Sequence, residues 1–352
     1  MVSKDVTWET VTTTNAGVDA GFLNNRLNIA ADYYWKKNDG MLAQLEAGNL
    51  IGISTLPYEN TGILKTWGWD LSVQWRDRIG DVSYQVGFNI DDSQNKLVSY
   101  EGVNTIGART VSRLEGYPLY TIWGYQTDGF WNSRDEYLDY KAANPGYESY
   151  YWDAKLDGGD VRYVAQGKAD HRIGEGGGTP EDPGDLILLG TENPRYMYGI
   201  NLGAQWKGFD FSMFWQGVGN RKYILDNNTA FAPLSNGSSN RQPWTVHVDY
   251  WTEDNPNAYF ARLIENQTFN YQVSDRWIQN GAYIRLKNIQ LGYTIPIPEN
   301  IINSLRVYVT GTDLWEHTKA KFKAYDPEVS NNKNQNYYPF FRTWTVGINL
   351  TF

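Results

Sequence analysis

The sequence contains no cysteine and no apolar run of the ~18–20 residues that a membrane-spanning helix requires. The first absence excludes disulfide bonds and thiolate nucleophiles, and it suits a chain that crosses an oxidising periplasm. The second excludes a helical membrane span. The mean hydropathy of -0.57 suggests a soluble protein. However, a transmembrane β-strand presents only every second residue to lipid, so its mean hydropathy also stays polar.

The sequence also lacks a basic excess and a recognisable catalytic motif. Its net charge of -9 disfavours nucleic acid as a partner, because phosphate binding needs a concentrated basic face. His171, His247 and His317 are far apart and lack metal-ligand spacing. The glycines at 174–178 are not followed by the Lys-Ser/Thr pair of a phosphate loop. We therefore expect no catalytic residue, no cofactor, no metal site and no enzymatic activity.

Aromatic residues are abundant at 15%, and many of them belong to runs in which apolar and polar residues alternate. Such a period of two is typical of a β-strand with two different faces. In residues 67–76 the apolar members are Trp67, Trp69, Leu71, Val73 and Trp75. The same alternation recurs at residues 27–35, 82–90, 196–206, 209–215 and 344–352.

Strand length separates a membrane barrel from a soluble β-sandwich, whose strands also alternate. These runs last about 9–11 residues, which is the length of a tilted membrane strand, whereas soluble strands average about 5–6. Aromatic residues also stand at the ends of the apolar rows, as at Trp67 and Trp75 or at Tyr196 and Trp206. That placement would form two interfacial girdles. The pattern favours an all-β, antiparallel transmembrane β-barrel segment.

Short and long connections alternate along the chain, as in outer-membrane barrels with short periplasmic turns and long extracellular loops. The segment Leu119–Trp131 is β-like, and we interpret it as an extracellular excursion, although it could be half of a second hairpin. This gives roughly nine spanning strands. The alternation slips once, which predicts a β-bulge near Lys287 and Asn288. The short turns are expected at 23–26, 77–81, 207–208 and 296–304, and the long loops at about 37–65, 92–194, 217–280 and 314–342.

Nine strands are too few for a large plugged transporter, which has about 22. An open sheet would also leave two unpaired edges in hydrocarbon. Residues 1–5 contain no apolar signal region, although an outer-membrane protein must be exported. We therefore expect residues 1–352 to be the C-terminal part of a longer barrel domain, with the plug domain and the upstream strands absent.

Several segments, taken in order, resemble the C-terminal third of the Sus-type (SusC/RagA) TonB-dependent transporters. Each segment is weak by itself, but their order and coverage of the whole chain are specific. They are residues 5–10 and 15–19, 22–27, 32–34, 124–130, 193–199, 209–212 with 216–217, 283–288 and 347–352.

The resemblance implies the outer membrane of a Gram-negative bacterium, outer-membrane lipid around the barrel, and import of glycans or oligopeptides. It also implies two protein partners: the TonB system, acting through the absent plug, and a SusD-like surface lipoprotein. Members of the family often carry a calcium-like loop before the Asn-Pro segment. Here Ala165, Gly167 and Ala169 offer no side-chain oxygen at the corresponding positions, so we expect no ion there.

Three groups of site residues follow from these interpretations. Aromatic side chains in the external loops could stack on a sugar ring or a peptide side chain, or could simply pack between loops. An alternative function is a soluble or surface carbohydrate-binding module without transport activity. The loop aromatics are Trp131, Trp152, Trp244, Trp251 and Trp315; the polar residues expected to face the lumen are Asp32, Asp70, Gln74 and Arg76; the expected assembly signal comprises Trp344 and Phe352.

Overall fold

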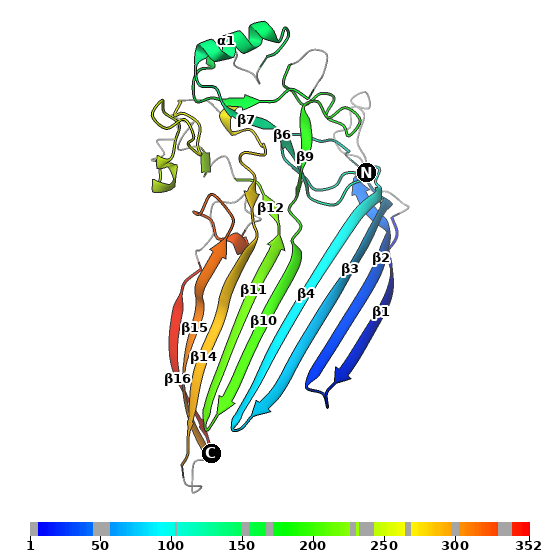
Figure 1. Ribbon diagram of the computed structural model, residues 1–352. Coiled ribbons are helices and arrows are strands. Elements are labelled where there is room, and N and C mark those ends of the chain that lie inside the picture. Colours follow the sequence, from blue (N-terminus) through cyan, green and yellow to red (C-terminus); the bar gives the residue numbers. More distant parts are fainter. Residues whose placement is uncertain are drawn as a thin grey trace.

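The computed structural model describes residues 6–44, 57–102, 104–148, 155–166, 172–225, 230–231, 243–264, 269–297, 303–329 and 340–352. Its main element is one antiparallel sheet of nine long strands, which we call the wall (Figure 1). In spatial order the strands are β1 (Thr10–Phe22), β2 (Leu27–Gln44), β3 (Tyr58–Ile79), β4 (Val82–Ser99), β10 (Arg195–Trp206), β11 (Phe209–Asn220), β14 (Tyr283–Ile295), β15 (Ser304–Thr318) and β16 (Thr343–Thr351).

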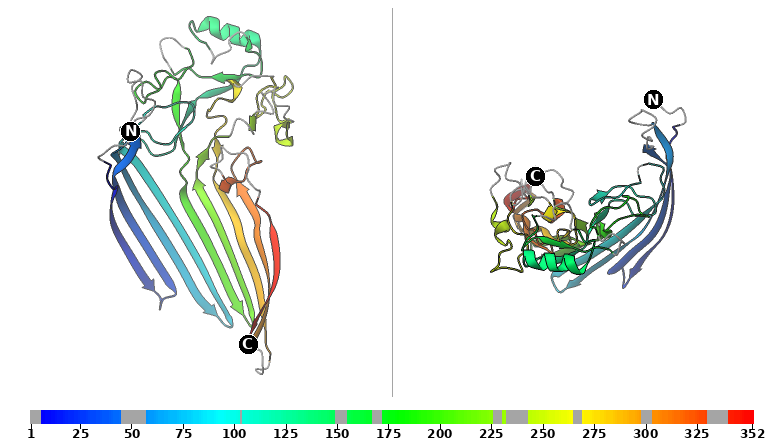
Figure 2. Two further views of the ribbon diagram at one scale, coloured as in Figure 1. Left: turned by 180° about the vertical axis from the view of Figure 1, so that it is seen from behind. Right: turned by 90° about the horizontal axis from the view of Figure 1, so that it is seen from above.

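The register of the wall separates the side chains into two faces. Leu71 of β3 is paired with Ile90 of β4, and Ile90 is paired with Tyr198 of β10, so the apolar rows of neighbouring strands coincide. Asp32 and Asp70 are paired in the same way on the opposite face. Seen from above, the sheet follows an arc (Figure 2). The prediction of an antiparallel β-barrel segment is confirmed, with one apolar and one polar face.

The connections follow the expected alternation of short and long. Tight turns join β1 to β2, β3 to β4 and β10 to β11, and Leu23, Asn24 and Asn25 adopt left-handed backbone angles in the first of these. Several strands extend past the predicted runs, since β2 reaches Gln44 and β3 begins at Tyr58. The fourth expected turn, at 296–304, and several of the long loops fall partly outside the described residues.

The predicted β-bulge is present between β14 and β15. The pairing passes from Leu286–Trp315 to Asn288–Thr312, which leaves Lys287 unpaired on one strand and two residues unpaired on the other. One of these, Asp313, has a φ of 53°, and its carboxylate lies 2.8 Å from the Lys287 ammonium. The ion pair therefore spans the two sides of the bulge.

The long connections at one end of the wall fold into a packed unit, which we call the loop body (Figure 1). We define it as the described residues of 100–194, 221–281 and 319–329. The segment Leu119–Trp131 belongs to it and does not cross the wall, as predicted for an excursion. Its elements are β5 (Thr110–Val111), β6 (Thr121–Tyr125), β7 (Thr127–Phe130), α1 (Arg134–Ala143), β8 (Val161–Tyr163), β9 (Leu186–Thr191), β12 (Lys222–Tyr223) and β13 (Gln279–Asn280), with short 3-10 turns at Thr245–Val248, Phe269–Tyr271 and Pro327–Val329.

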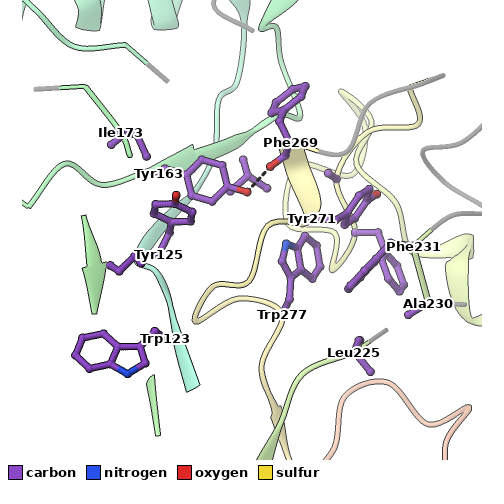
Figure 3. Close-up of a cluster of buried hydrophobic side chains, with 14 of the residues drawn as sticks. Trp123, Tyr125, Tyr163, Ile173, Leu225, Ala230, Phe231, Phe269, Tyr271 and Trp277 are labelled. Atoms are coloured by element: carbon purple, nitrogen blue, oxygen red, sulfur yellow. Dashed lines mark hydrogen bonds between the residues drawn. The ribbon is translucent and has the colours of Figure 1, made fainter. Parts of the chain in front are cut away.

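The loop body contains the principal hydrophobic core of the chain (Figure 3). Helix α1 begins there because the Ser133 hydroxyl accepts the Glu136 N–H, and two acidic residues occupy its first turn. Among the described helices, none has both the length and the apolar character needed to span a membrane. The fold is thus an extended wall with a globular unit at one end.

The membrane face of the wall can be tested at two adjacent positions of β3. Leu71 lies on the apolar face, and Ser72 lies on the polar face, paired with Asn89. In the longer protein that we expect to contain this chain, which we call the full-length parent, Leu71→Arg should impair assembly, because a charge near the bilayer midplane costs about 2–4 kcal/mol. Ser72→Arg should be tolerated. Heat-modifiable gel migration of membrane fractions measures both, and equal effects would contradict the assigned faces.

Candidate loop body and lumenal wall

The five tryptophans considered for ligand contact have different environments. Trp131 is fully buried in the core of the loop body, where its ring meets Tyr137, Tyr140 and Tyr147 edge-on or tilted, and Arg162 lies over it at 4.8 Å. Its position corresponds to packing, which corrects the ligand-contact role considered from sequence. Trp152 lies outside the described residues.

Trp315 was expected in an external loop, but it belongs to β15. Its ring packs edge-on against Trp215 at 5.6 Å, and the Trp215 indole N–H donates to the Met213 sulfur. Met213 is paired with Ile289 in the apolar rows of the wall. Trp315 is therefore on the apolar face, at the extracellular end, and not at a ligand-facing mouth. Strand pairing resumes after the bulge at Asp313, so β15 extends to Thr318 and past its predicted end.

Trp244 and Trp251 remain in the loop body. Trp251 is half-buried on the backbone of Gly158 and Gly159, where a Cβ atom would lie 2.8 Å and 2.4 Å from its ring. Trp244 is 42% exposed and stacks on the ring of His247 at 5.7 Å. Of the four candidate tryptophans that lie in the described residues, Trp244 thus combines a loop position with an exposed ring.

A buried carboxylate joins two long loops of the loop body. Asp160 has no exposed surface, and it accepts two hydrogen bonds from Arg262, at 2.8 and 2.7 Å, and one from Asn270 at 2.9 Å. Burial alone would lower the pKa of Arg262, but the hydrogen bonds and charge of Asp160 raise it overall. In the sequence, Asp160 was considered only as part of a calcium-like stretch. Its partner Arg262 was not recognised because it is a lone cation about a hundred residues away.

A second buried group holds the segment that contains Trp244. The His247 Nδ1 atom accepts the Trp244 backbone N–H at 3.0 Å. Its Nε2–H donates to the Ala230 carbonyl at 2.8 Å, which fixes the neutral ring as the Nε2 tautomer. Burial lowers the pKa of His247, and the bond to Ala230 opposes that shift only in part. The imidazole is a structural link in this site.

A third charged group anchors the last external loop to the wall. Arg285 of β14 is fully buried and donates to Glu316, to Asp326 and, at 2.7 Å, to Glu328. The ring of Phe340 lies 5.1 Å from the Arg285 guanidinium. Residues on either side of positions 330–339 therefore converge on one cation. Among the described residues, no group of three or more His, Cys, Asp or Glu side chains could hold a metal ion.

The polar face of the wall carries the residues predicted to line a lumen. Asp32 is paired with Asp70, Gln74 with Gly87, and Arg76 with Gln85, all opposite the tryptophan row. Near the tight turns this face forms open grooves. Their lining includes Arg76, Gln85, Gln205, Asp210 and Arg306, and the last two form an ion pair with a hydrogen bond of 2.8 Å. Trp344 and Phe352, the expected assembly signal, are strongly exposed.

No family model matches the sequence. TonB-dependent receptor P26 of Formosa agariphila is 26% identical over 377 residues, covering 99% of this chain and 35% of the receptor. TonB-dependent receptor SusC of Bacteroides thetaiotaomicron is 24% identical, covering 99% of this chain and 32% of SusC. A solved structure of the RagAB peptide transporter aligns with a TM-score of 0.73 at 25% identity, covering 99% of this chain and 36% of that chain.

The alignments with these relatives extend over both the wall and the loop body and cover nearly the whole chain. A curved antiparallel wall with a large external unit defines a segment of an outer-membrane-type β-barrel. Along nearly its whole length the chain is similar to a barrel portion of SusC-type TonB-dependent receptors, as the resemblance predicted. It spans about a third of the length of these relatives.

The Asp160 link should determine the local stability of the loop body. Asp160→Asn in the full-length parent should destabilise this unit by about 3–5 kcal/mol, because removing one partner of a buried ion pair leaves the other charge uncompensated. Asp81→Asn is a matched control, since its pair with Lys207 is exposed and worth at most about 1 kcal/mol. Hydrogen exchange of residues 155–166 and 243–264 measures the difference. Equal protection in both variants would contradict this role.

The His247 link should make the same unit sensitive to acid. The folded pKa is below the ordinary value of about 6.5, so the unfolded segment binds a proton first as pH falls. The stabilising contribution of neutral His247 is complete above the ordinary pKa of about 6.5. It is lost as the pH falls from that value to the lower pKa of the folded state. Proteolysis near residue 247 should accelerate from pH 7 to pH 5 in the parent and much less in His247→Gln. The same acceleration in both proteins would exclude His247 as the cause.

Proposed function

We propose that this chain forms part of the barrel wall and the extracellular mouth of an outer-membrane transporter that imports glycans or oligopeptides. The single observation that carries the proposal is the combination of a lipid-type apolar face, a polar inner face and an ordered loop body at one end. A solved structure of a peptide transporter shares this fold over 99% of the chain. The location in the outer membrane of a Gram-negative bacterium belongs to the same proposal.

The other parts of the machine would come from the remaining two thirds of such a receptor. We assign to them the plug and the strands that complete the barrel, with TonB supplying energy through the plug. A SusD-like lipoprotein would cover the mouth. The polar residues of the wall, including Asp32, Asp70, Gln74 and Arg76, would face the lumen and the plug. Trp344 and Phe352 would form the assembly signal at the end of β16.

The alternative, a soluble carbohydrate-binding module, is not favoured. A soluble sheet of this size buries at least one face against another layer. Here Val86 of β4 and Leu291 of β14, in the apolar rows of two inner strands, are 41% and 49% exposed, as a lipid-facing row would be. Extraction separates the two functions: the parent protein should leave the membrane only with detergent. Release by alkaline carbonate or high salt alone would contradict membrane insertion.

Transport itself requires an uptake measurement. The parent should be expressed in an outer membrane whose own receptors of this class are deleted, and uptake of labelled glycan and peptide pools should be followed. We expect parent-dependent uptake that stops when the proton-motive force is dissipated. Uptake that is independent of TonB would contradict the proposed mechanism.

The exposed ring of Trp244 provides a specific test of the mouth. Trp244→Ala should weaken substrate or lipoprotein binding roughly tenfold, because an aromatic anchor at an interface is worth about 1–2 kcal/mol or more. Trp315→Ala is the matched control, since that ring is on the apolar face and should leave affinity unchanged. Titration calorimetry on the purified complex measures both. An unaltered affinity for Trp244→Ala would make this residue a packing contact.

A further inference from the structure

Three lysines occupy neighbouring positions on three adjacent strands of the wall. Lys37 of β2 is paired with Lys65 of β3, and Lys65 is paired with Lys96 of β4. All three side chains are exposed. Two strand spacings separate the outer members, so the row spans about 10 Å. We call these three residues the lysine row.

The lysine row is on the apolar face, at the extracellular end of the lipid-facing band. Trp35 is paired with Trp67, two residues from the row on each strand, and both rings belong to the outward alternation. Two residues along a strand correspond to about 6.6 Å. Since β2 runs away from the tight turns, the lysines are farther from them than the tryptophans are. The row is thus at the headgroup level, just beyond the aromatic girdle.

The lysine row has an unbalanced positive charge. Lys37 is paired with Asp39, but among the described residues neither Lys65 nor Lys96 has an ion-pair partner. Asp92, the carboxylate nearest to Lys96 along the outward side of β4, is buried and holds Arg195 in two hydrogen bonds. Like charges directly opposite one another are destabilising in a sheet. This local excess stands out in a chain whose net charge is -9.

We infer that the lysine row binds the phosphate groups of an anionic lipid in the outer leaflet of the membrane. Ammonium groups bind phosphate as point charges, and a row of three provides several donors to one diphosphorylated headgroup. The long side chains can extend from the wall to that level while their methylene stems stay against lipid. The tryptophans Trp35 and Trp67 would contact the acyl chains below. This inference rests on the membrane placement in the proposed function, but not on import.

The test uses the purified full-length parent in neutral detergent, with diphosphoryl lipid A as the probe and its fully dephosphorylated form as the comparison. Affinity is measured by native mass spectrometry and thermophoresis at low and high salt. We expect the parent to prefer the phosphorylated lipid and to lose affinity as salt is added. The triple variant K37Q/K65Q/K96Q should bind it roughly 100-fold more weakly, since each basic residue near an anionic membrane surface contributes about a factor of five.

Two controls keep the outcome interpretable. Lys36→Gln removes an exposed lysine from the polar face and should leave lipid affinity unchanged. The triple Arg variant keeps the charge and should retain binding. Heat-modifiable migration verifies folding, and single Gln variants at Lys65 and Lys96 replace the triple variant if it fails to assemble. Wild-type affinity in the Gln variants, an equal loss in Lys36→Gln, or equal binding of both lipids would overturn the inference. Detergent-free extraction tests membrane placement separately.

Discussion

The wall depends on one constraint: every backbone N–H and C=O group in hydrocarbon needs a partner, because water is not available there. Antiparallel pairing meets this need for the seven inner strands, from β2 to β15. The outer strands β1 and β16 are paired on one side only within the described part of the chain. A lipid-embedded wall of this kind needs further strands to close it. The threefold greater length of the SusC-type relatives is consistent with that need.

The same constraint divides the chain into two kinds of structure. The wall is stabilised by backbone pairing between neighbouring strands, so its side chains need only alternate between an apolar and a polar face. The loop body is exposed to water and has to build a hydrophobic core, in which Trp131 and Phe260 are fully buried. It also uses specific polar links such as Asp160 with Arg262. These buried charges carry a desolvation penalty that their pairing has to offset, so the loop body is stable only in the arrangement that joins the two loops.

Sequence patterns predicted the wall because a period of two is visible in a single strand. They also located the bulge at Lys287, since one unpaired residue reverses the phase of the alternation. The loop body has no such period, and its contacts join residues a hundred positions apart. For that reason Trp131 was placed with the exposed loop aromatics. Trp315 was placed with them because the bulge at Asp313 breaks the alternation before the end of β15. A further limit is register: Lys37 and Lys65 were expected at the two ends of a long loop, and only the strand pairing shows that Lys65 lies between two other lysines.

The wall meets the last external loop near the bulge between β14 and β15. Arg285 lies two residues before Lys287, the unpaired residue of the bulge, and the carboxylate partners of both come from β15 and from the loop that follows it. An apolar contact would tolerate small shifts of that loop, whereas buried ion pairs lose much of their energy when displaced. The bulge also turns the strand locally, because the extra residues increase its twist. The described residues that flank the last loop, Glu328 and Phe340, are therefore held against the wall by the Arg285 cation and not by apolar packing alone.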